Sequence, residues 1–420
     1  MTLPALLVAV ALSQNVNWSV GARLDLRART AYEGLDSNSV AAGDVGVGLD
    51  GQLGLSFGGW NLSIAYDPTF RLREPYAVQN GVHYDYTHRA TASADWRREG
   101  SPHPYIRYSF NSGILDLSTL QTPTGATVPT NPIHGANIIN TFGSDLTAGI
   151  DWPLSPLTTL TTEGGYFWGG GSDFLSAVTL PVQASPRGSV RLNTQLSPTD
   201  HLQVSLDGRY SLFGIWFGPY DGFLLQRVAM LNLQAMWTHQ LDASTSFDLN
   251  AGGGLAGGDV PTSTHGVGNI TPPQPLGTGG AGVTHQLHFG HDTLLDLRAQ
   301  ASVGPFIDPY LGTAYERVEG SFGLGLASGP HFLAWSRTGY GRSLLGGAYD
   351  VRSTYEDAGV GWQGAPWWRV DLSGRLAYFY QGSGPVAPNV ASGVLLTGGA
   401  PLHQYSWVIG LSLTLTQRSE

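Results

Sequence analysis

The chain lacks cysteine and lysine, and it has few charged residues of either sign. Without cysteine there is no disulfide framework, no thiolate metal site and no lipid-modified N-terminal cysteine. Only 12% of the residues are charged, which is about half of the usual share. The net charge is −10 and no basic run exists, so nucleic acid is excluded as a partner, because phosphate contacts need a basic surface.

Long hydrophobic runs are also absent. The longest, Pro4–Leu12 (PALLVAVAL), is about half of what a helix needs to cross a bilayer. Followed by Ser13 and Gln14, it predicts a signal peptide over residues 1–13. The basic segment that normally precedes such a run is missing, so we expect this peptide to be truncated at its N-terminus. A short buried first strand is the alternative interpretation. Residues 14–420 are predicted to form a single domain.

Strict alternation of apolar and polar residues is the dominant pattern. The stretch Val16–Ala28 (VNWSVGARLDLRA) alternates over its whole length, which is longer than an ordinary half-buried strand. Period-2 counting finds about 18 such segments. They lie at 16–28, 45–57, 60–66, 84–96, 106–110, 142–152, 160–168, 190–196, 202–212, 229–237, 247–255, 283–289, 295–303, 318–326, 333–335, 358–362, 368–380 and 405–415.

Short and long connections alternate between these segments. The short ones are rich in Gly, Pro, Asp and Ser, which favour tight turns: Gly58-Gly59, Glu99–His103, Pro153–Pro156, Ser197–Asp200, Leu241–Ser244, Gly290–Asp292, Ser328–Pro330 and Gly364–Pro366. The long ones include Asn111–Asn137, Ala256–Gly280 and Gln381–His403. This asymmetry predicts an all-β fold, a transmembrane antiparallel up-and-down β-barrel of about 18 strands with short periplasmic turns and long extracellular loops.

Tryptophan gathers at one end of the predicted strands. Nine of the 12 tryptophans lie near a short turn or near the first strand: Trp18, Trp60, Trp96, Trp152, Trp237, Trp335, Trp362, Trp367 and Trp368. Ordinary core aromatics would be scattered along the strands instead. Amphipathic rings are stable at the lipid headgroup level, so we expect a membrane-interface belt. Its predicted members are Trp18, Trp60, Trp96, Trp152, Trp237, Trp362 and Trp368.

In a barrel the apolar face contacts lipid and the polar face lines the lumen. About 18 strands leave room for an aqueous channel. The predicted pore-lining residues are Arg23, Asp25, Arg27, Asp85, Arg89, Asp116, Arg191, Gln195, Asp207, Arg209, Arg298, Asp371 and Arg375. The same charges could instead brace the wall as cross-strand ion pairs, and the two roles are compatible. Their signs are nearly balanced, which favours a path for neutral polar solutes over an ion-selective one.

The same alternation places Leu333 and Trp335 on the lipid face.

A search for catalytic and metal-binding motifs finds neither HExxH nor GxSxG, and His285, His288 and His291 lack carboxylates at zinc spacing. We therefore predict no catalytic residue, metal or cofactor. The aromatic connection Phe213–Phe223 (FGIWFGPYDGF) suggests Trp216, Phe217 and Tyr220 as a carbohydrate-stacking loop. The alternative is a loop that packs on its own aromatics over the barrel mouth.

This plan resembles bacterial outer-membrane barrels over essentially the whole chain, without a diagnostic motif. The similar families are maltoporin-like and other substrate-specific porins, and barrels that export polysaccharide together with a periplasmic protein. In porins the third long loop folds into the lumen, which here corresponds to Asn111–Asn137, with Asp116 as its only acid. Porins also commonly end on an aromatic residue, whereas this chain ends LTLTQRSE, which leaves Leu415 or Trp407 for recognition by the insertion machinery.

The resulting expectation is an integral outer-membrane pore for hydrophilic cargo. Carbohydrate is the favoured cargo, and polysaccharide export ranks ahead of uptake. The expected partners are outer-membrane lipid, the cargo, the insertion machinery and a periplasmic export protein. A general diffusion porin is the first alternative and a plugged surface scaffold or adhesin is the second. An outer-membrane enzyme ranks last.

Overall fold

The computed structural model describes residues 15–418 of the chain, apart from several short gaps. The gaps are 33–38, 74–82, 117–137, 174–175, 178–179, 217–222, 261–268, 271–272, 291, 309–312, 345–350 and 382–401. The predicted signal peptide at 1–13 lies outside the described residues. No helix in the described part of the chain is long and apolar enough to span a membrane.

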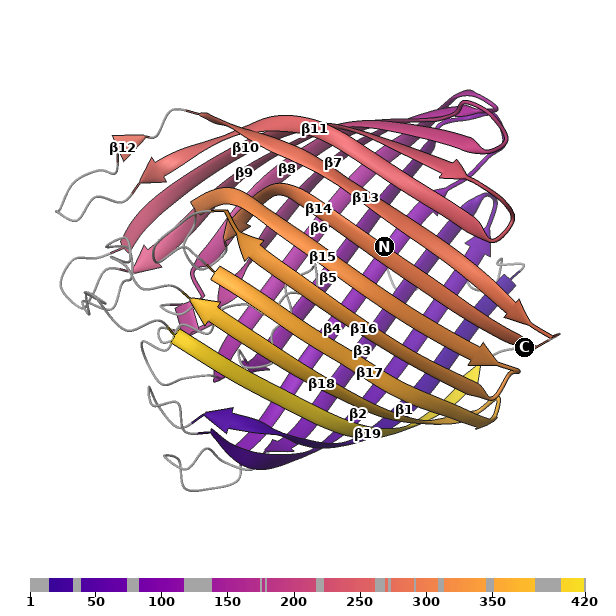
Figure 1. Ribbon diagram of the computed structural model, residues 1–420, viewed down its shortest axis with the longest axis vertical. Helices are drawn as coiled ribbons and strands as arrows, with labels where there is room; N and C mark the ends of the chain where they lie inside the picture. The colour runs from indigo at the N-terminus through magenta and orange to yellow at the C-terminus, as the bar shows by residue number, and fades with distance from the viewer. Residues whose placement is uncertain are drawn as a thin grey trace.

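The described residues form β-strands joined in a single sheet (Figure 1). The strands of the first half are β1 (Asn15–Tyr32), β2 (Ser39–Phe57), β3 (Trp60–Arg73), β4 (His83–Trp96), β5 (His103–Asp116), β6 (Ile138–Ser155), β7 (Thr158–Gly171), β8 (Val182–Gln195) and β9 (Asp200–Trp216). Those of the second half are β10 (Phe223–Gln240), β11 (Thr245–Val260), β12 (Asn269–Ile270), β13 (Gln274–Phe289), β14 (Thr293–Asp308), β15 (Thr313–Ser328), β16 (Phe332–Ser343), β17 (Val351–Ala365), β18 (Trp368–Gln381) and β19 (Leu402–Arg418).

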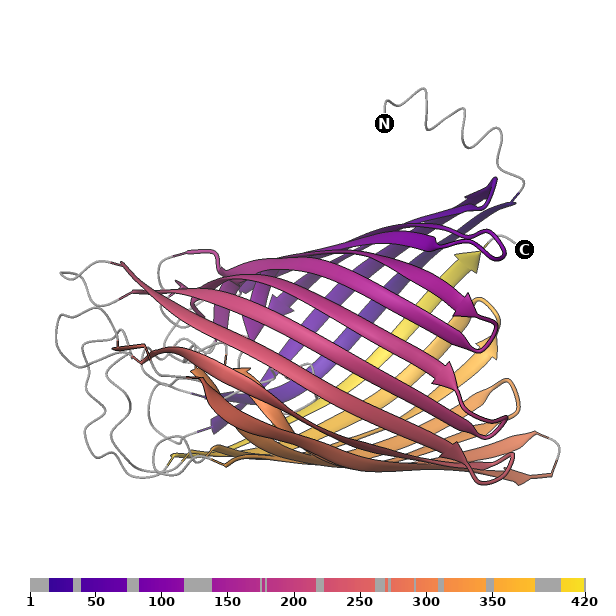
Figure 2. The same ribbon diagram turned by 90° about the horizontal axis from the view of Figure 1, so that it is seen from above.

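The sheet closes on itself through its first and last strands. Leu24 of β1 lies opposite Val47 of β2 on one side and Leu413 of β19 on the other. The two-residue β12 pairs only with β11, so 18 strands form the wall. All pairs are antiparallel, and Figure 2 shows the strands slanting across the wall. Closure leaves no sheet edge, which satisfies the backbone donors and acceptors in lipid.

The predicted fold class is therefore confirmed, with short turns at one end of the barrel and long connections at the other. The predicted alternating segments fall on the 18 wall strands, and only Leu196 lies one residue past its strand, β8. The described residues at both ends of the chain, near Asn15 and Arg418, lie at the end with the short turns. One such turn is Gly58-Gly59, where both residues have positive φ (55° and 87°), a conformation that glycine adopts without steric cost.

The long connections are shorter than the sequence predicted. Strand β5 continues to Asp116 and β11 continues to Val260, so the predicted loops Asn111–Asn137 and Ala256–Gly280 begin too early. Strand β6 also continues through Pro153, with a register shift before Ser155. These extensions contain Gly, Asn and Pro, whose side chains give no apolar alternation. Their backbones still pair with a neighbouring strand, and backbone pairing is what defines a strand.

Directly opposed residues of antiparallel strands share a face, which allows each face to be followed around the barrel. Leu24, Leu206 and Leu372 all lie on the outer face and are 42–48% exposed. Strand β16 contradicts the prediction for one pair, because Ser336 and Ala334 lie opposite the outer residues Leu324 and Leu326. Leu333 and Trp335 therefore face the lumen, and their assignment to lipid was wrong. The middle of the outer face of β16 has the small and hydroxyl side chains of Ala334, Ser336 and Thr338, so apolarity alone misidentified this face.

Two aromatic girdles encircle the outer face at different heights. The seven predicted belt tryptophans all lie on the outer face, within four residues of a turn-end strand terminus. Near the opposite end the outer aromatics are mainly tyrosines: Tyr84, Tyr86, Tyr210, Tyr340, Tyr378 and Tyr405. An apolar band flanked by aromatic girdles is the pattern of a barrel in lipid. That the tryptophans anchor the protein at the interface remains a prediction.

The face assignment predicts how introduced charge affects assembly. Leu24→Arg places a charge on the outer face near mid-strand, at a cost of about 2–4 kcal/mol at the bilayer midplane. Gln300→Arg places the same charge on the lumen face of β14, where the side chain is exposed. We expect Leu24→Arg to deplete the heat-modifiable, folded band in outer-membrane fractions, and Gln300→Arg to leave it unchanged. Equal amounts of folded protein for both variants would contradict the face assignment.

Candidate functional site: the lumen of the barrel

The first charged sector of the lumen lies on β1 and β2. Arg23 Nε lies 3.0 Å from Asp25 Oδ2, and Arg27 Nη2 lies 3.7 Å from the same oxygen. Nearer the loop end of the barrel, Arg29 Nε donates to Asp44 Oδ2 at 2.8 Å, and both side chains are 2% exposed. Alternation along β1 places Arg23, Asp25, Arg27 and Arg29 on one face, so the strand supplies its own ion pairs.

The second sector lies on β5 to β9. The Arg187 guanidinium makes a forked contact with Asp145, at 2.9 Å and 2.6 Å, and also donates to Thr147 at 2.8 Å. Tyr105 donates to Glu163 at 2.7 Å. Forked arginine–carboxylate pairs have fixed geometry as well as strength. Arg187 and Asp145 therefore form a rigid, neutralised pair, whereas Arg191 and Arg209 on the same face each have a buried Nε without a hydrogen-bond partner among the described residues.

The third sector lies on β14 to β18. Its ion pairs are Arg298–Asp296 at 2.6 Å, Arg317–Glu319 at 3.1 Å, Arg369–Asp371 at 2.5 Å and Arg375–Asp357 at 3.4 Å. Aromatic rings accompany the guanidinium groups, since Arg317 lies over Phe306 at 5.0 Å and Arg375 over Tyr355 at 5.1 Å. Such stacking adds to ion pairing when the groups are partly desolvated.

A fourth sector, on β10, β11 and β13, is almost free of charge. Among its described lumen-facing positions, Asp248 and His288 are the two acidic or basic residues. The remaining positions are mostly amides, hydroxyls and glycines, such as Asn232, Gln234 and Thr278. Amides and hydroxyls donate and accept hydrogen bonds without attracting ions. The lumen thus combines charged sectors, in which arginine–carboxylate pairs neutralise many of the charges, with one neutral polar sector.

The two halves of the lumen differ in packing. Among the described residues, the fully buried side chains are Arg29, Ser185, Ser211, Phe213, Ser343 and Ser353. Each lies on the lumen face within five residues of the loop end of its strand. At that level β15 also approaches β10 and β11, which are not its neighbours in the sheet. By contrast, Arg298 near the turn end is 70% exposed. The lumen is therefore open at the turn end and tightly lined near the loop end.

The structure places the described predicted pore-lining side chains on the lumen face, where Asp85 is buried and Arg89 is exposed. Arg191, Gln195, Asp207 and Arg209 share that face on β8 and β9. Asp116 ends β5, and loop residues 117–137 lie outside the described residues. That the lumen-facing residues line a pore remains a prediction.

Sequence reasoning missed several lumen residues, including Asp145, Arg187, Arg317 and Tyr355. Asp145 and Arg187 fit the alternation of their strands, so parity counting could have found them. Arg317 and Tyr355 lie just before the predicted segments 318–326 and 358–362, where the alternation had not been followed. Their ring and ion-pair contacts join strands, and no local sequence signal reports such contacts.

The predicted carbohydrate-stacking loop is only partly described. Trp216 is the last residue of β9 and lies opposite Phe223 of β10, so both belong to strands rather than to a loop. Phe213 is fully buried on the lumen face, which corrects its assignment to an outward connection. Phe217 and Tyr220 lie outside the described residues. In the described part of the chain, no group of three or more His, Asp or Glu residues could hold a metal ion.

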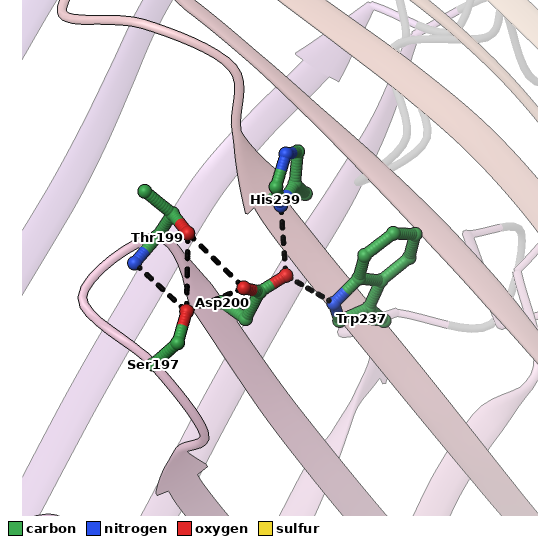
Figure 3. A network of polar contacts seen from close by, with 5 residues as sticks. All are labelled: Ser197, Thr199, Asp200, Trp237 and His239. Atoms are coloured by element: carbon green, nitrogen blue, oxygen red, sulfur yellow. Dashed lines mark hydrogen bonds and ion pairs between the residues drawn. The ribbon is translucent and has the colours of Figure 1, made fainter.

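A polar network lies on the outer face at the turn end, around Asp200 (Figure 3). Asp200 accepts hydrogen bonds from Ser197 and, at 3.1 Å, from Thr199 and Trp237, and His239 Nδ1 lies 2.7 Å from Oδ1. The Ser197 hydrogen bond and then that of His239 hold the pKa of Asp200 well below its usual range. The network joins the turn before β9 to β10 and fixes the orientation of the Trp237 indole.

Comparisons with solved structures show the fold. The FrpB iron transporter of Neisseria meningitidis (F5-1 variant, apoprotein) has a TM-score of 0.52 at 9% identity, covering 97% of this chain and 83% of that one. The copper transporter OprC has a TM-score of 0.50 at 9% identity, covering 97% and 81%. The third comparison, OccK3 of Pseudomonas aeruginosa, is 13% identical with a TM-score of 0.46 and covers 99% of each chain. No curated protein matches the chain.

The closed barrel, its lipid-type outer face and its polar lumen define an integral β-barrel of the bacterial outer membrane, of the kind that forms transport pores. The model of the EpsX exopolysaccharide export family matches residues 7–395. The chain belongs to this family.

The buried ion pair on β1 and β2 gives a stability prediction. Asp44→Leu leaves the Arg29 guanidinium buried without its carboxylate, and we expect a loss of about 3–5 kcal/mol in the free energy of unfolding. Replacing both partners, as in Arg29→Met with Asp44→Leu, should recover most of that loss, because neither charge is then buried without the other. Guanidinium unfolding in detergent micelles measures both variants. A double variant no more stable than Asp44→Leu would show that the pair does not act as a unit.

The Asp200 network gives a pH prediction. A depressed pKa means that the carboxylate stabilises the fold above its ordinary unfolded value of about 3.9, and that this stability is lost as pH falls toward the depressed pKa. Asp200→Asn should therefore lower the heat-unfolding midpoint at about pH 7, with a difference from wild type that shrinks at acid pH. Asp292→Asn, in the β13–β14 turn, is the control. A difference that grows on acidification would contradict the network's role.

Proposed function

We propose that the chain is a passive outer-membrane pore that exports a polysaccharide. The observation that carries this proposal is the lumen wall, where many of the charges form arginine–carboxylate pairs and where β10, β11 and β13 present amides, hydroxyls and glycines. A polymer of neutral or weakly charged sugars needs many hydrogen-bonding groups and no strong ionic site, and this wall supplies them. No step of such transport requires catalysis.

The family match supports export over uptake. The family is described by exopolysaccharide export, and the match extends over residues 7–395. The open turn end suits entry of a polymer from the periplasm, because lumen side chains such as Arg298 and Arg369 are exposed there. The tightly lined loop end suits a restricted exit that limits leakage of small solutes in the absence of cargo.

A passive pore requires one partner that delivers its cargo and another that inserts it into the membrane. We propose that a separate periplasmic export protein delivers the polymer to the turn end of the barrel. Insertion into the outer membrane requires the insertion machinery, and the last strand, β19, offers Trp407 and Leu415 on its outer face for recognition. Outer-membrane lipid contacts the remainder of that face.

A plugged scaffold is the second candidate, and the packing of the loop end favours it. Arg29, Phe213 and Ser353 are fully buried in the lumen, as expected of a barrel closed at one level. Such a protein would bind a partner through its loops and would admit no solute. A general diffusion porin, by contrast, would pass charged and neutral solutes according to size alone.

Single-channel recording separates these candidates. We expect the purified protein to conduct in planar bilayers, and we expect a variant lacking residues 117–137 to conduct more, because in similar porins that loop narrows the lumen. An Asn-Gly pair replaces the deleted residues, because Asp116 at the end of β5 and Ile138 at the start of β6 lie directly opposite each other and need a two-residue turn to stay paired. A folded protein that never conducts, with or without this segment, would contradict the pore hypothesis and favour the scaffold.

Export is tested in the cell. Deleting the gene should abolish secreted polysaccharide and cause polymer to accumulate in the periplasm, and the wild-type gene should restore secretion. An uptake pore would instead give normal secretion together with slow growth on an oligosaccharide supplied in the medium.

A further inference from the structure

Trp335 is unusual among the tryptophans whose side chains the structure describes, because it lies on the lumen face of its strand. It is the fourth residue of β16 and lies directly opposite Gly359 of β17. A Cβ atom at Gly359 would come within 2.9 Å of the indole carbons Cε2 and Cζ2. The indole therefore occupies the space above a residue that has no side chain, close to the open end of the barrel.

The indole remains accessible from the lumen, with Trp335 37% exposed. Two other lumen rings that cover a glycine are engaged by the protein. Tyr355 covers Gly339 but is 5% exposed and has the Arg337 and Arg375 guanidinium groups over its ring at 5.7 Å and 5.1 Å. Tyr105 covers Gly149 and donates to Glu163. Trp335 thus presents an aromatic surface to the lumen where these other rings do not.

Two arginine–aspartate pairs flank this surface. Arg369 and Asp371 lie over Gly361, two residues from Gly359 along β17, and two residues correspond to about 6.6 Å. On the other side Asp357 lies two residues from Gly359 and pairs with Arg375 at 3.4 Å. The spacing places one polar pair on each side of Gly359 along β17, and Arg369 and Asp371 are the more exposed pair, at 40% and 27% against 12% and 15% for Arg375 and Asp357.

We propose that Trp335 is a glycan-stacking subsite of the lumen. The apolar C–H face of a pyranose ring would pack on the indole, and the exposed Arg369–Asp371 pair would hydrogen-bond its hydroxyls. The inference rests on the proposed function for its cargo class and deepens it by naming the residue that holds a sugar unit. A single stacking surface binds weakly, which suits a polymer that must pass through.

Channel block by sugar tests the subsite. The probes are maltohexaose and cellohexaose, two neutral glucose hexamers of different linkage, added to the turn-end side of single channels in planar bilayers. We expect at least one to block wild-type channels, and we expect Trp335→Ala to raise its half-blocking concentration about tenfold. Conductance without sugar should stay near the wild-type value, because the rest of the lumen wall is unchanged.

Trp362→Ala is the matched control. Trp362 is the fourth residue from the turn end of β17 and lies opposite Phe332, three residues nearer the turn than Gly359, but it is on the outer face and is 51% exposed. It should fold and be blocked by sugar as the wild type is. Trp335→Leu is the second variant, because leucine fills the space over Gly359 without an aromatic face. It should also lose block, whereas Trp335→Phe should retain part of it.

The outcomes separate the subsite from the pore. If the wild type does not conduct, the proposed function fails, and calorimetric titration of either hexamer into detergent-solubilised protein still tests Trp335. Sugar binding or block that is equal in the Trp335→Ala and Trp362→Ala variants would overturn the subsite. So would wild-type protein that neither hexamer binds or blocks.

Discussion

The structure depends on the need of every backbone N–H and C=O group in lipid to find a partner within the protein. Strand pairing meets that need only when the sheet has no edge, and the pairing of β1 with both β2 and β19 removes the edge. Closure forces one face of every strand outward and the other inward. The alternation of the sequence, the lipid contact of Leu24 and the lumen position of Asp25 all follow from this single constraint.

Closure also explains why the charged residues are tolerated. An isolated charge in a dry core costs several kcal/mol, but most of these charges face a lumen wide enough to hold water. Where burial is complete, as at Arg29 and Asp44, the two ions pair directly. The lumen has exposed ion pairs near the turn end and buried groups near the loop end. The two ends therefore differ, and the proposed export pathway runs from the turn end to the loop end.

The fold was largely predictable because lipid imposes a period-2 pattern over many residues. The strand number, the antiparallel order and the alternation of short turns with long connections followed from the alternation of side chains and from turn chemistry. Strand ends rich in glycine and asparagine could not be placed, since backbone pairing leaves no trace in side-chain hydropathy. Trp335 was assigned to lipid because it is apolar, although its strand presents Ala334 and Ser336 outward. Its lumen position follows from the register of β16 with β15, and Gly359 of β17 leaves space for the indole; no local pattern reveals either.

The central claim is that the odd and even residues of each strand face different media, and cysteine scanning tests it most directly. The chain has no cysteine, so a single introduced thiol reports one position without background. Along β14 a membrane-impermeant maleimide should label cysteines at positions 296, 298, 300 and 302 in intact outer membranes and spare those at 295, 297, 299 and 301. Labelling that ignores parity, or that favours the odd positions, would contradict the water-filled lumen on which the account rests.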